Sequence, residues 1–477
     1  MILKKTQLVL LFSFLAMTIS CAKDSKQETT KDAYQKSNQL SMKDAQTIFD
    51  YAYPLVLMRI SQDLMFTVPF RESSHPNEFI MFKQLAKPEN KAVVLGNRNT
   101  LYCVAWIDLS KGPVVFETPD MGKRYFVMPL IDAWTNTFKS IGSRTTGQGA
   151  QKYFIVNKQW SGSVPKGYEK VVSPTNMVWI TGRIQADNDK DALAVNKLQD
   201  NYVLKNYSQM LSGVDPYKDY KPDFKAIWVR KPVPYSLKMD ADDFYDTFFT
   251  QWSYNSSLKD DKKILKIMSE AGIKPSIKEF DQLNDNIKDV LTKALEKKQE
   301  EYLADFYKGK SQKKAWIFNT TAMGTWGNDY KKRAYWAVWG LGANLTQDAV
   351  YGVSQLDNRL QQLSGSDVYK LHFKKNGTPK VGGFWSITAY DNEGYLEANK
   401  ENRYASGSNM KLSYNNDGTL DIYLSAKKPK GVSNFNWVPT PKDEFKILFR
   451  MYWPEKYILD GKYTLPEITK INMKKAH

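Results

Sequence analysis

The sequence predicts a mainly β protein with a helical insert, an α+β chain built from several domains. Two stretches, residues 93 to 179 and residues 354 to 453, alternate apolar and polar residues or carry short apolar runs, as half-buried strands do. Between them, residues 188 to 340 carry apolar residues at helical intervals. A chain of 477 residues is long enough for two or three domains with cores of their own.

These patterns divide the chain into five segments. Residues 22 to 40 are polar, charged and without periodicity, which is typical of a flexible tether. The predicted segments are a lipoprotein signal peptide (1–20), the tether (21–40), an N-terminal helix followed by a β sandwich (41–187), a mainly helical subdomain (188–353) and a C-terminal β domain (354–477).

The first twenty residues predict an export signal. Lys4 and Lys5 form a positive segment, and an apolar run follows over residues 8 to 19. This run is shorter than the roughly 20 residues that a membrane span needs, so a secretory signal is favoured. Cys21 directly follows the small Ser20, as at a lipoprotein cleavage site where the cysteine becomes acylated. We therefore expect a lipid-anchored protein of the bacterial envelope, periplasmic or at the outer membrane, with ordinary secretion as the alternative.

Residues 41 to 66 predict a helix. Ser41 and Asp44 have capping-box spacing. The apolar residues that recur at helical intervals are Ile48, Ala52, Leu55, Val56 and Ile60. Pro54 lies inside this stretch and is expected to kink the helix.

Two more helices are predicted in the insert, and two clear strands beyond it. Gly272 suits the left-handed end of a helix, and Ser276 with Glu279 has the spacing of a helix start. Residues 419 to 424 alternate after an Asp-Gly turn, and residues 445 to 453 alternate as cleanly. In the second strand the apolar side is Phe445, Ile447, Phe449, Met451 and Trp453, and the other side is Lys446, Leu448, Arg450 and Tyr452.

The formal net charge is +17, from 68 Lys and Arg against 51 Asp and Glu. The lysines are scattered and interleaved with acids, and the chain carries no arginine-rich block or nucleic-acid motif. We therefore expect a solvated, lysine-rich surface and no nucleic-acid partner. Adhesion to an anionic envelope polymer is the alternative.

Cysteine and histidine are scarce, with two Cys and three His. If Cys21 is lipidated, only Cys103 remains, so no disulfide framework is possible. A common zinc site needs clustered His, Cys or acids, and the sequence has no such spacing. His75 and His372 are isolated and are expected to be structural. The sequence predicts neither a metal nor a cofactor.

Longer motifs in both β regions resemble a bacterial family. In the first region they are Asn99-Thr100-Leu101-Tyr102, Asp108-Leu109-Ser110-Lys111-Gly112-Pro113, Arg124-Tyr125, Leu130-Ile131-Asp132, Thr135-Asn136 and Gly142-Ser143-Arg144-Thr145-Thr146-Gly147. In the second they are Trp385-Ser386-Ile387-Thr388-Ala389-Tyr390-Asp391, Asn402-Arg403-Tyr404, Asn436-Trp437-Val438-Pro439 and Arg450-Met451-Tyr452-Trp453-Pro454. The first set resembles the domain of unknown function 1254, and the second resembles its companion, the domain of unknown function 1214.

The resemblance implies a three-part architecture: an N-terminal immunoglobulin-like β sandwich, a helical subdomain, and a C-terminal jelly-roll-like β sandwich. It implies no established activity, and a fold alone does not supply one. One departure is notable, because Asn99 stands where the family usually has an aspartate. Any role of that carboxylate in relatives would be absent here.

Polar and aromatic residues inside these motifs predict a pocket between the two β domains. Arginine offers a planar fork that suits carboxylate or sulfate, and the motifs contain arginines in a chain that prefers lysine. The residues expected to bind a polar or anionic small molecule or glycan are Asn99, Tyr102, Arg124, Asp132, Trp134, Asn136, Arg144, Trp385, Arg403, Tyr404, Trp437 and Arg450. The alternative for the arginines is buried Arg–Asp pairing, and for the tryptophans a place in the core.

Two other functions remain open from the sequence. A carboxylate-based hydrolase would need two carboxyls at a suitable separation, and Asp132 is the weak catalytic candidate. A purely structural envelope protein would have no ligand at all. The sequence does not name a ligand.

Overall fold

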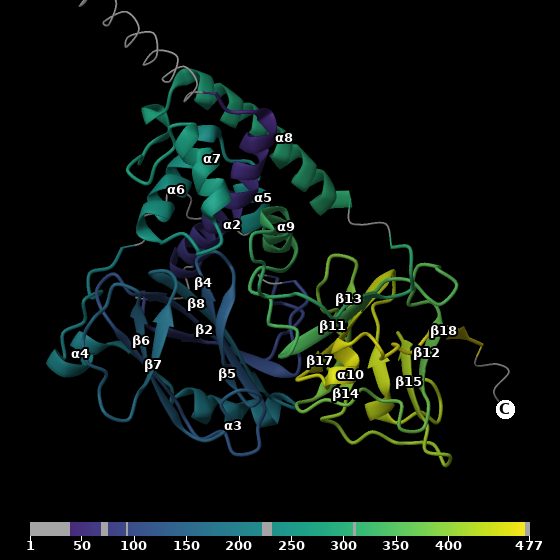
Figure 1. The fold of residues 1–477 in the computed structure, drawn as a ribbon. Helices are drawn as coiled ribbons and strands as arrows, with labels where there is room; N and C mark the ends of the chain where they lie inside the picture. The colour runs from purple at the N-terminus through teal and green to yellow at the C-terminus, as the bar shows by residue number, and fades with distance from the viewer. Residues whose placement is uncertain (1–38, 68–74, 92–93, 222–230, 309–311, 473–477) are drawn as a thin grey trace, which may run out of the picture.

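The computed structural model describes residues 39–67, 75–91, 94–221, 231–308 and 312–472. The predicted signal peptide, Cys21 and residues 21 to 38 of the tether lie outside these residues. Figure 1 shows three units: a helical unit above two β units that stand side by side. The predicted fold class, mainly β with a helical insert, is confirmed.

The first β unit is a sandwich of two sheets that enclose an apolar core. The five-stranded sheet has the order β1 (Phe79–Met81), β2 (Thr100–Asp108), β8 (Met177–Gln185), β4 (Phe126–Asp132), β5 (Thr137–Gly142). The four-stranded sheet has the order β7 (Glu169–Ser173), β6 (Gln151–Asn157), β3 (Val114–Thr118), β9 (Val203–Asn206). Two helices belong to this unit, α3 (Asp189–Gln199) and α4 (Tyr207–Ser212).

The outward face of the five-stranded sheet positions the candidate site. Inward side chains such as Leu101 and Cys103 enter the sandwich core. Because side chains alternate along a strand, Tyr102 and Trp106 of β2 point away from that core. The helical unit packs on the end of this face near Trp106. The second β unit packs on the other end, where Asn97 donates to Tyr452 and where Tyr125 and Val127 pack with Phe384.

The helical unit is built around α2 (Met42–Thr67), which is buried along most of its length. Ser41 Oγ accepts from the backbone N–H of Asp44 at 3.1 Å, as the predicted cap requires. The helix continues through Pro54. The other helices are α5 (Pro232–Ser236), α6 (Ala241–Tyr254), α7 (Lys262–Glu270), the 3-10 turn η1 (Phe280–Gln282), α8 (Asp285–Lys308) and α9 (Tyr330–Gly340).

The second β unit is also a two-sheet sandwich around its own core. One sheet has the order β10 (Ile317–Asn319), β11 (Ala349–Ser354), β17 (Phe445–Tyr452), β13 (Trp385–Asp391), β14 (Ala405–Gly407). The other has the order β16 (Trp437–Pro439), β15 (Leu420–Ser425), β12 (Val368–Phe373), β18 (Ile468–Ile471). The 3-10 turn η2 (Asn434–Asn436) and α10 (Lys456–Leu459) complete it.

The units differ from the predicted segments at three points. The N-terminal helix α2 was grouped with the sandwich, but its apolar side chains pack into the helical unit. The first sandwich extends beyond residue 187, because β9 pairs with β3. The second sandwich begins before residue 354, because β11 pairs with β17. Each difference arises because pairing and packing partners lie far apart in the sequence.

Candidate functional site

Two rows of side chains face each other where the β units meet. On β2 and β8, Tyr102 is paired with Arg183 across the strands. On β11, β17 and β13, Arg450 lies between Tyr351 and Ser386. Directly paired residues of antiparallel strands project on the same side of the sheet. Each β unit therefore presents one arginine, flanked by a tyrosine, to the other unit.

Arg450 is bonded to groups of both β units. Its Nη1 donates to Thr388 Oγ1 at 3.2 Å, and its Nη2 donates to Tyr390 Oη at 2.8 Å. Nη2 also donates to the backbone oxygen of Leu95 in the first unit at 2.6 Å. These acceptors are all uncharged, and Nε donates to no residue in the part of the chain that the structure describes. The side chain is buried, with 3% of its surface exposed.

Arg183, on the first β unit, has hydrogen-bond partners similar to those of Arg450. Its Nη1 donates to Thr181 O at 2.7 Å and to Asn344 Oδ1 at 3.2 Å. Nε and Nη2 donate to no described residue, which leaves one edge of the guanidinium fork free. The guanidinium lies over the ring of Tyr102 at 5.5 Å from its centre.

Neither arginine has a carboxylate partner among the described residues. Tyrosines lie beside both guanidiniums: Arg183 lies over the ring of Tyr102, and Arg450 lies over the ring of Tyr390 and donates to its hydroxyl. Burial raises the pKa of Tyr452 above the usual tyrosine range, and it does the same for Tyr390. These phenols are therefore neutral at neutral pH. In the part of the chain that the structure describes, the two positive charges therefore have no carboxylate in contact with them.

The polar groups around the arginines are mainly donors. Asn97 Oδ1 accepts from the N–H of Asn99 at 2.8 Å, so its Nδ2 donates, and it does so to Tyr452 Oη at 2.6 Å. Asn344 Oδ1 accepts from Arg183, so its Nδ2 donates to Tyr351 Oη at 2.9 Å. The hydroxyl protons of both tyrosines are then left without an acceptor among the described residues.

Ser386 adds a further unpartnered group on the same face. Its side chain is 0% exposed, and its Oγ has no hydrogen-bond partner within the described chain. It is the direct cross-strand neighbour of Arg450. Buried polar groups are normally hydrogen-bonded. An oxygen-rich anion would satisfy the guanidiniums, the phenols and this hydroxyl together.

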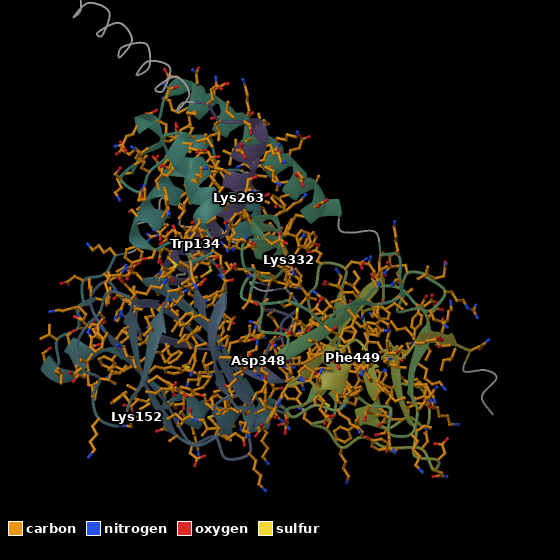
Figure 2. All side chains as sticks on the ribbon, in the orientation of Figure 1. Trp134, Lys152, Lys263, Lys332, Asp348 and Phe449 are labelled. Carbon is orange, nitrogen blue, oxygen red and sulfur yellow. The ribbon has the colours of Figure 1, made fainter. Side chains whose placement is uncertain are left out.

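A paired arginine stands next to this unpaired set. Arg144 Nε donates to Asp348 Oδ1 at 2.7 Å, and Ser140 Oγ donates to Asp348 Oδ2 at the same distance. Tyr125 Oη donates to the backbone oxygen of Asp348 at 3.1 Å. Figure 2 shows Asp348 between the two β units. The charge of this acid is matched by Arg144, and within the described residues it forms no ion pair with Arg183 or Arg450.

Three predicted site residues lie elsewhere, below the helical unit. Asp132 Oδ1 accepts from the backbone N–H groups of Trp134 and Asn136, both at 2.9 Å, so the carboxylate organises a turn. Burial raises the pKa of Asp132 to about 6, although these hydrogen bonds and the charge of Arg333 oppose the shift. Trp134 stacks on Tyr51 with ring centres 4.5 Å apart. This group forms a packed junction and does not join the two arginines.

Five other predicted residues have local roles. Arg124 pairs with Asp191, with nitrogen–oxygen distances of 2.6 and 2.8 Å. Trp385 is buried in the second sandwich core. Trp437 is also buried, and its Nε1 donates to Ser425 O at 3.1 Å.

Arg403 lies over the ring of Phe435 at 5.3 Å, and Tyr404 lies under Arg98 at 5.1 Å. Burial lowers the pKa of Arg403. Of the predicted set, the structure brings together Tyr102 and Arg450 in the unpaired group, with Arg144 beside it. Asn99 is buried near the start of β2, and its side-chain amide has no partner among the described residues.

Sequence reasoning missed Arg183. Its signal was a single charge in the strand Met177–Gln185, which is otherwise mostly apolar or small. The bridging residues Asn97, Asn344 and Tyr351 gave no signal of their own, because each acts through a partner far away in the sequence.

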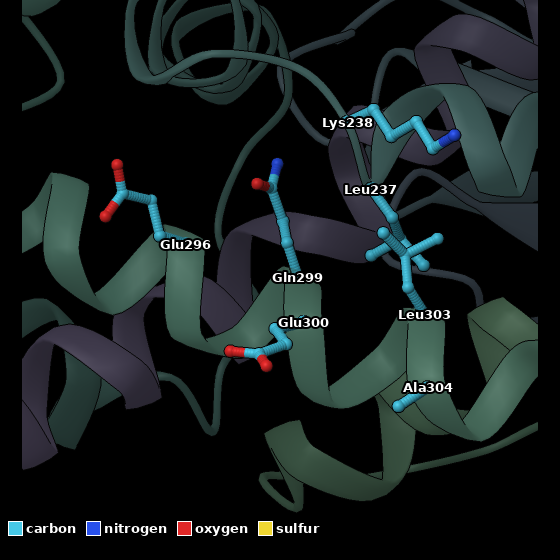
Figure 3. Close-up of a pocket in the computed structure, with 7 residues that line it drawn as sticks. All are labelled: Leu237, Lys238, Glu296, Gln299, Glu300, Leu303 and Ala304. Atoms are coloured by element: carbon cyan, nitrogen blue, oxygen red, sulfur yellow. The ribbon is translucent and has the colours of Figure 1, made fainter.

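An open pocket elsewhere has a different character. It lies between α8 and the chain that follows α5 (Figure 3), and it is lined by Leu237, Lys238, Glu296, Gln299, Glu300, Leu303 and Ala304. Its two glutamates disfavour an anion.

Within the described ranges, we find no cluster of three metal-ligating His, Cys, Asp or Glu residues. No helix in these ranges is long and apolar enough to cross a membrane.

Family models match both β units. Protein of unknown function (DUF1254) matches residues 76–206, and Protein of unknown function (DUF1214) matches residues 348–456. The chain belongs to the family that joins these two domains. Arg183 thus lies in the DUF1254 domain and Arg450 in the DUF1214 domain. No match was found among curated proteins.

Two solved structures are similar to the chain. The VPA0106 protein from Vibrio parahaemolyticus is 25% identical, with a TM-score of 0.68 over 90% of this chain and 100% of that one. An uncharacterised protein from Burkholderia cenocepacia is 10% identical, with a TM-score of 0.43 over 94% of this chain and 97% of that one. The likeness to the Vibrio protein supports the overall fold described above.

Proposed function

We propose that the chain is an exported envelope lipoprotein that binds a polar, anionic small molecule or glycan between its DUF1254 and DUF1214 domains. The observation that carries the proposal is the pair Arg183 and Arg450, two guanidiniums at the domain interface whose hydrogen-bond acceptors among the described residues are all uncharged. Removing an ion from water costs several kcal/mol unless a partner compensates it. A bound anion would offset that cost.

The same set of groups favours binding over hydrolysis. A hydrolase needs a general acid or base within hydrogen-bond reach of the substrate. The groups around the arginines are guanidiniums, amides and neutral hydroxyls, which donate or polarise but do not readily take a proton. Asp132, the earlier catalytic candidate, has one carboxylate oxygen bonded to two backbone N–H groups below the helical unit. We therefore favour a binding protein.

The envelope location rests on the sequence of the N-terminus. A positive segment, a short apolar run and Cys21 after Ser20 support export and lipidation. Expression of the full chain in a Gram-negative host and cell fractionation test this. The wild type should be in the membrane fraction, and Cys21→Ala should move to the soluble periplasmic fraction. Equal fractionation of the two proteins would contradict a lipid anchor.

A thermal-shift screen tests ligand binding. A ligand that binds only the folded state raises the melting temperature by mass action. The screen compares neutral sugars, uronic and sulfated oligosaccharides, carboxylates and divalent metal ions. We expect shifts with anions and none with neutral sugars, and we expect Arg450→Gln to remove them. No shift with any anion would favour the structural alternative, a protein without a ligand.

A further inference from the structure

The charge at the interface between the two domains narrows the class of anion that would bind there. Arg183 and Arg450 come from different domains, and the acid beside them, Asp348, already binds Arg144 and Ser140. Burial raises the pKa of Tyr390 and Tyr452, so these two phenols add no negative charge at neutral pH. Among the described residues, neither Arg183 nor Arg450 has a carboxylate partner, so the local charge is that of two arginines.

The free donors also come from both sides of the interface. Arg183 offers Nε and Nη2 from the DUF1254 domain. Arg450 Nε, Tyr452 Oη and Ser386 Oγ belong to the DUF1214 domain. Tyr452 is fixed from the opposite domain, because Asn97 donates to its oxygen at 2.6 Å. A single anion centred here would be held by both domains at once.

The side chains of the site differ in exposure. Arg450 and Ser386 are buried, whereas Tyr102, Arg183 and Tyr351 are half-buried and still contact solvent. These three residues therefore form the solvent-facing side of the site, and Arg450 and Ser386 form its buried side. In the proposed complex, the charged group of the ligand lies at the arginines, and the rest of a larger molecule lies toward Tyr102.

We infer that the ligand carries two negative charges and bridges Arg183 of the DUF1254 domain and Arg450 of the DUF1214 domain. This inference rests on the proposed function and makes it more specific. The charges belong either to one doubly charged group or to two nearby carboxylates. Each domain supplies half of the positive charge, so neither domain alone forms the site.

Isothermal titration calorimetry of the purified protein tests the inference with three probes at constant ionic strength. Inorganic phosphate carries its charge on one group, succinate carries two separated carboxylates, and acetate carries one charge. We expect phosphate or succinate to bind at least about tenfold more tightly than acetate, since the dianion pairs with both guanidiniums. Whichever dianion binds more tightly identifies the arrangement of the charges.

Arginine variants test the bridge. Arg183→Gln and Arg450→Gln should each remove the preference for the dianion, so that it binds no more tightly than acetate. Arg359→Gln is the matched control, because Arg359 is exposed on a turn and its loss changes the net charge equally. Tyr452→Phe keeps both charges and removes one donor, so affinity should fall several-fold while the dianion preference remains.

The outcomes separate this inference from the proposed function. Equal affinity for acetate and both dianions would overturn the inference and leave anion binding intact. Loss of the preference in only one of the two arginine variants would overturn the bridge. No binding of any anion would overturn both. If an arginine variant does not fold, the comparison of the three probes on the wild type still decides the charge of the ligand.

Discussion

The two ends of one sheet face differ sharply in the way they bury their side chains. On the outward face of the five-stranded sheet, Trp106 and Trp179 stack with ring centres 4.9 Å apart beneath the helical unit. Further along the same two strands, Tyr102 and Arg183 meet the DUF1214 domain. The paired residues of the first junction are aromatic and uncharged, although neither indole Nε1 has a hydrogen-bond partner among the described residues. The second contains a charge that folding alone does not favour.

The aromatic end of the sheet face can be understood from folding stability, whereas the charged end is the part to which we assign a function. Apolar burial is the main favourable contribution to folding, and the stacked rings of the aromatic end provide it. Buried polar groups with incomplete partners destabilise a fold, and they occur where a ligand or a reaction needs them. Under the proposed function, a bound anion at the charged end would compensate the two arginines.

The largest effect is expected at the aromatic junction. Trp134 is 0% exposed and stacks on Tyr51, so Trp134→Ala should lower the free energy of unfolding by about 3–5 kcal/mol. Chemical denaturation followed by circular dichroism measures this loss. Trp339→Ala is the control, because Trp339 is 37% exposed on α9, and it should cost less than about 1 kcal/mol. Equal losses would mean that this junction does not determine stability.

The paired arginine at the domain boundary should give the next largest effect. Arg144→Gln leaves the buried carboxylate of Asp348 without its cation, which should cost about 3 kcal/mol. The double variant with Asp348→Asn removes both charges, so its loss should be smaller than the sum of the two single losses. Denaturation of the four proteins gives the coupling. Strictly additive losses would show that the ion pair contributes nothing.

Asp132 should make the helical junction sensitive to pH. Its pKa in the folded state is about 6, above the ordinary aspartate value of roughly 3.9. Its contribution to stability is therefore fully present below about pH 4 and is lost as the pH rises through about 6. Between pH 4 and pH 7, Asp132→Asn should gain about 2 kcal/mol relative to the wild type.

Denaturation curves at several pH values measure that difference directly. Asp219→Asn is the control, because Asp219 is exposed, and its difference from the wild type should not change with pH. A flat difference for Asp132→Asn as well would mean that the carboxylate is not held in a desolvated turn. Anion binding at the domain interface should be the same in both variants, since neither residue lies there.

The sequence predicted strands and their faces well where one side of a strand enters a core. Along β17, the predicted apolar side enters the second sandwich core from Phe445 to Met451, and Arg450 points outward. The strand ends at Tyr452, one residue before the end of the predicted alternation. Trp453 has a φ of 55° and packs with the residues at the domain interface, because the strand turns there.

The site was harder to predict, because its residues acquire their roles from distant partners. Arg450 has the same local pattern as a surface arginine on an outward face. Its burial depends on partners that are distant in the sequence, among them the backbone of Leu95 and the side chain of Tyr390. Asp132 and Trp134 belonged to equally prominent motifs and proved to be part of a packed turn. A motif marks a constrained residue, and the fold decides whether the constraint is structural.

The smallest expected change in the free energy of unfolding is that of Arg183→Met, and it is opposite in sign to that of Arg144→Gln. Arg183→Met keeps an unbranched side chain and removes the uncompensated charge, so stability without ligand should remain unchanged or increase by up to about 1 kcal/mol. This contrasts with Arg144→Gln, which should destabilise the protein even though it removes the same charge. Denaturation in a buffer of weakly binding anions measures both variants.

The sign of that difference tests whether Arg183 serves folding or binding. A residue kept for folding destabilises the protein when it is replaced, whereas a residue kept for a ligand can be replaced without loss until the ligand is added. Addition of inorganic phosphate should therefore raise the melting temperature of the wild type above that of Arg183→Met. If Arg183→Met instead lost as much stability as Arg144→Gln, Arg183 would have a counter-charge in the folded protein, and the case for an anion between the domains would fail.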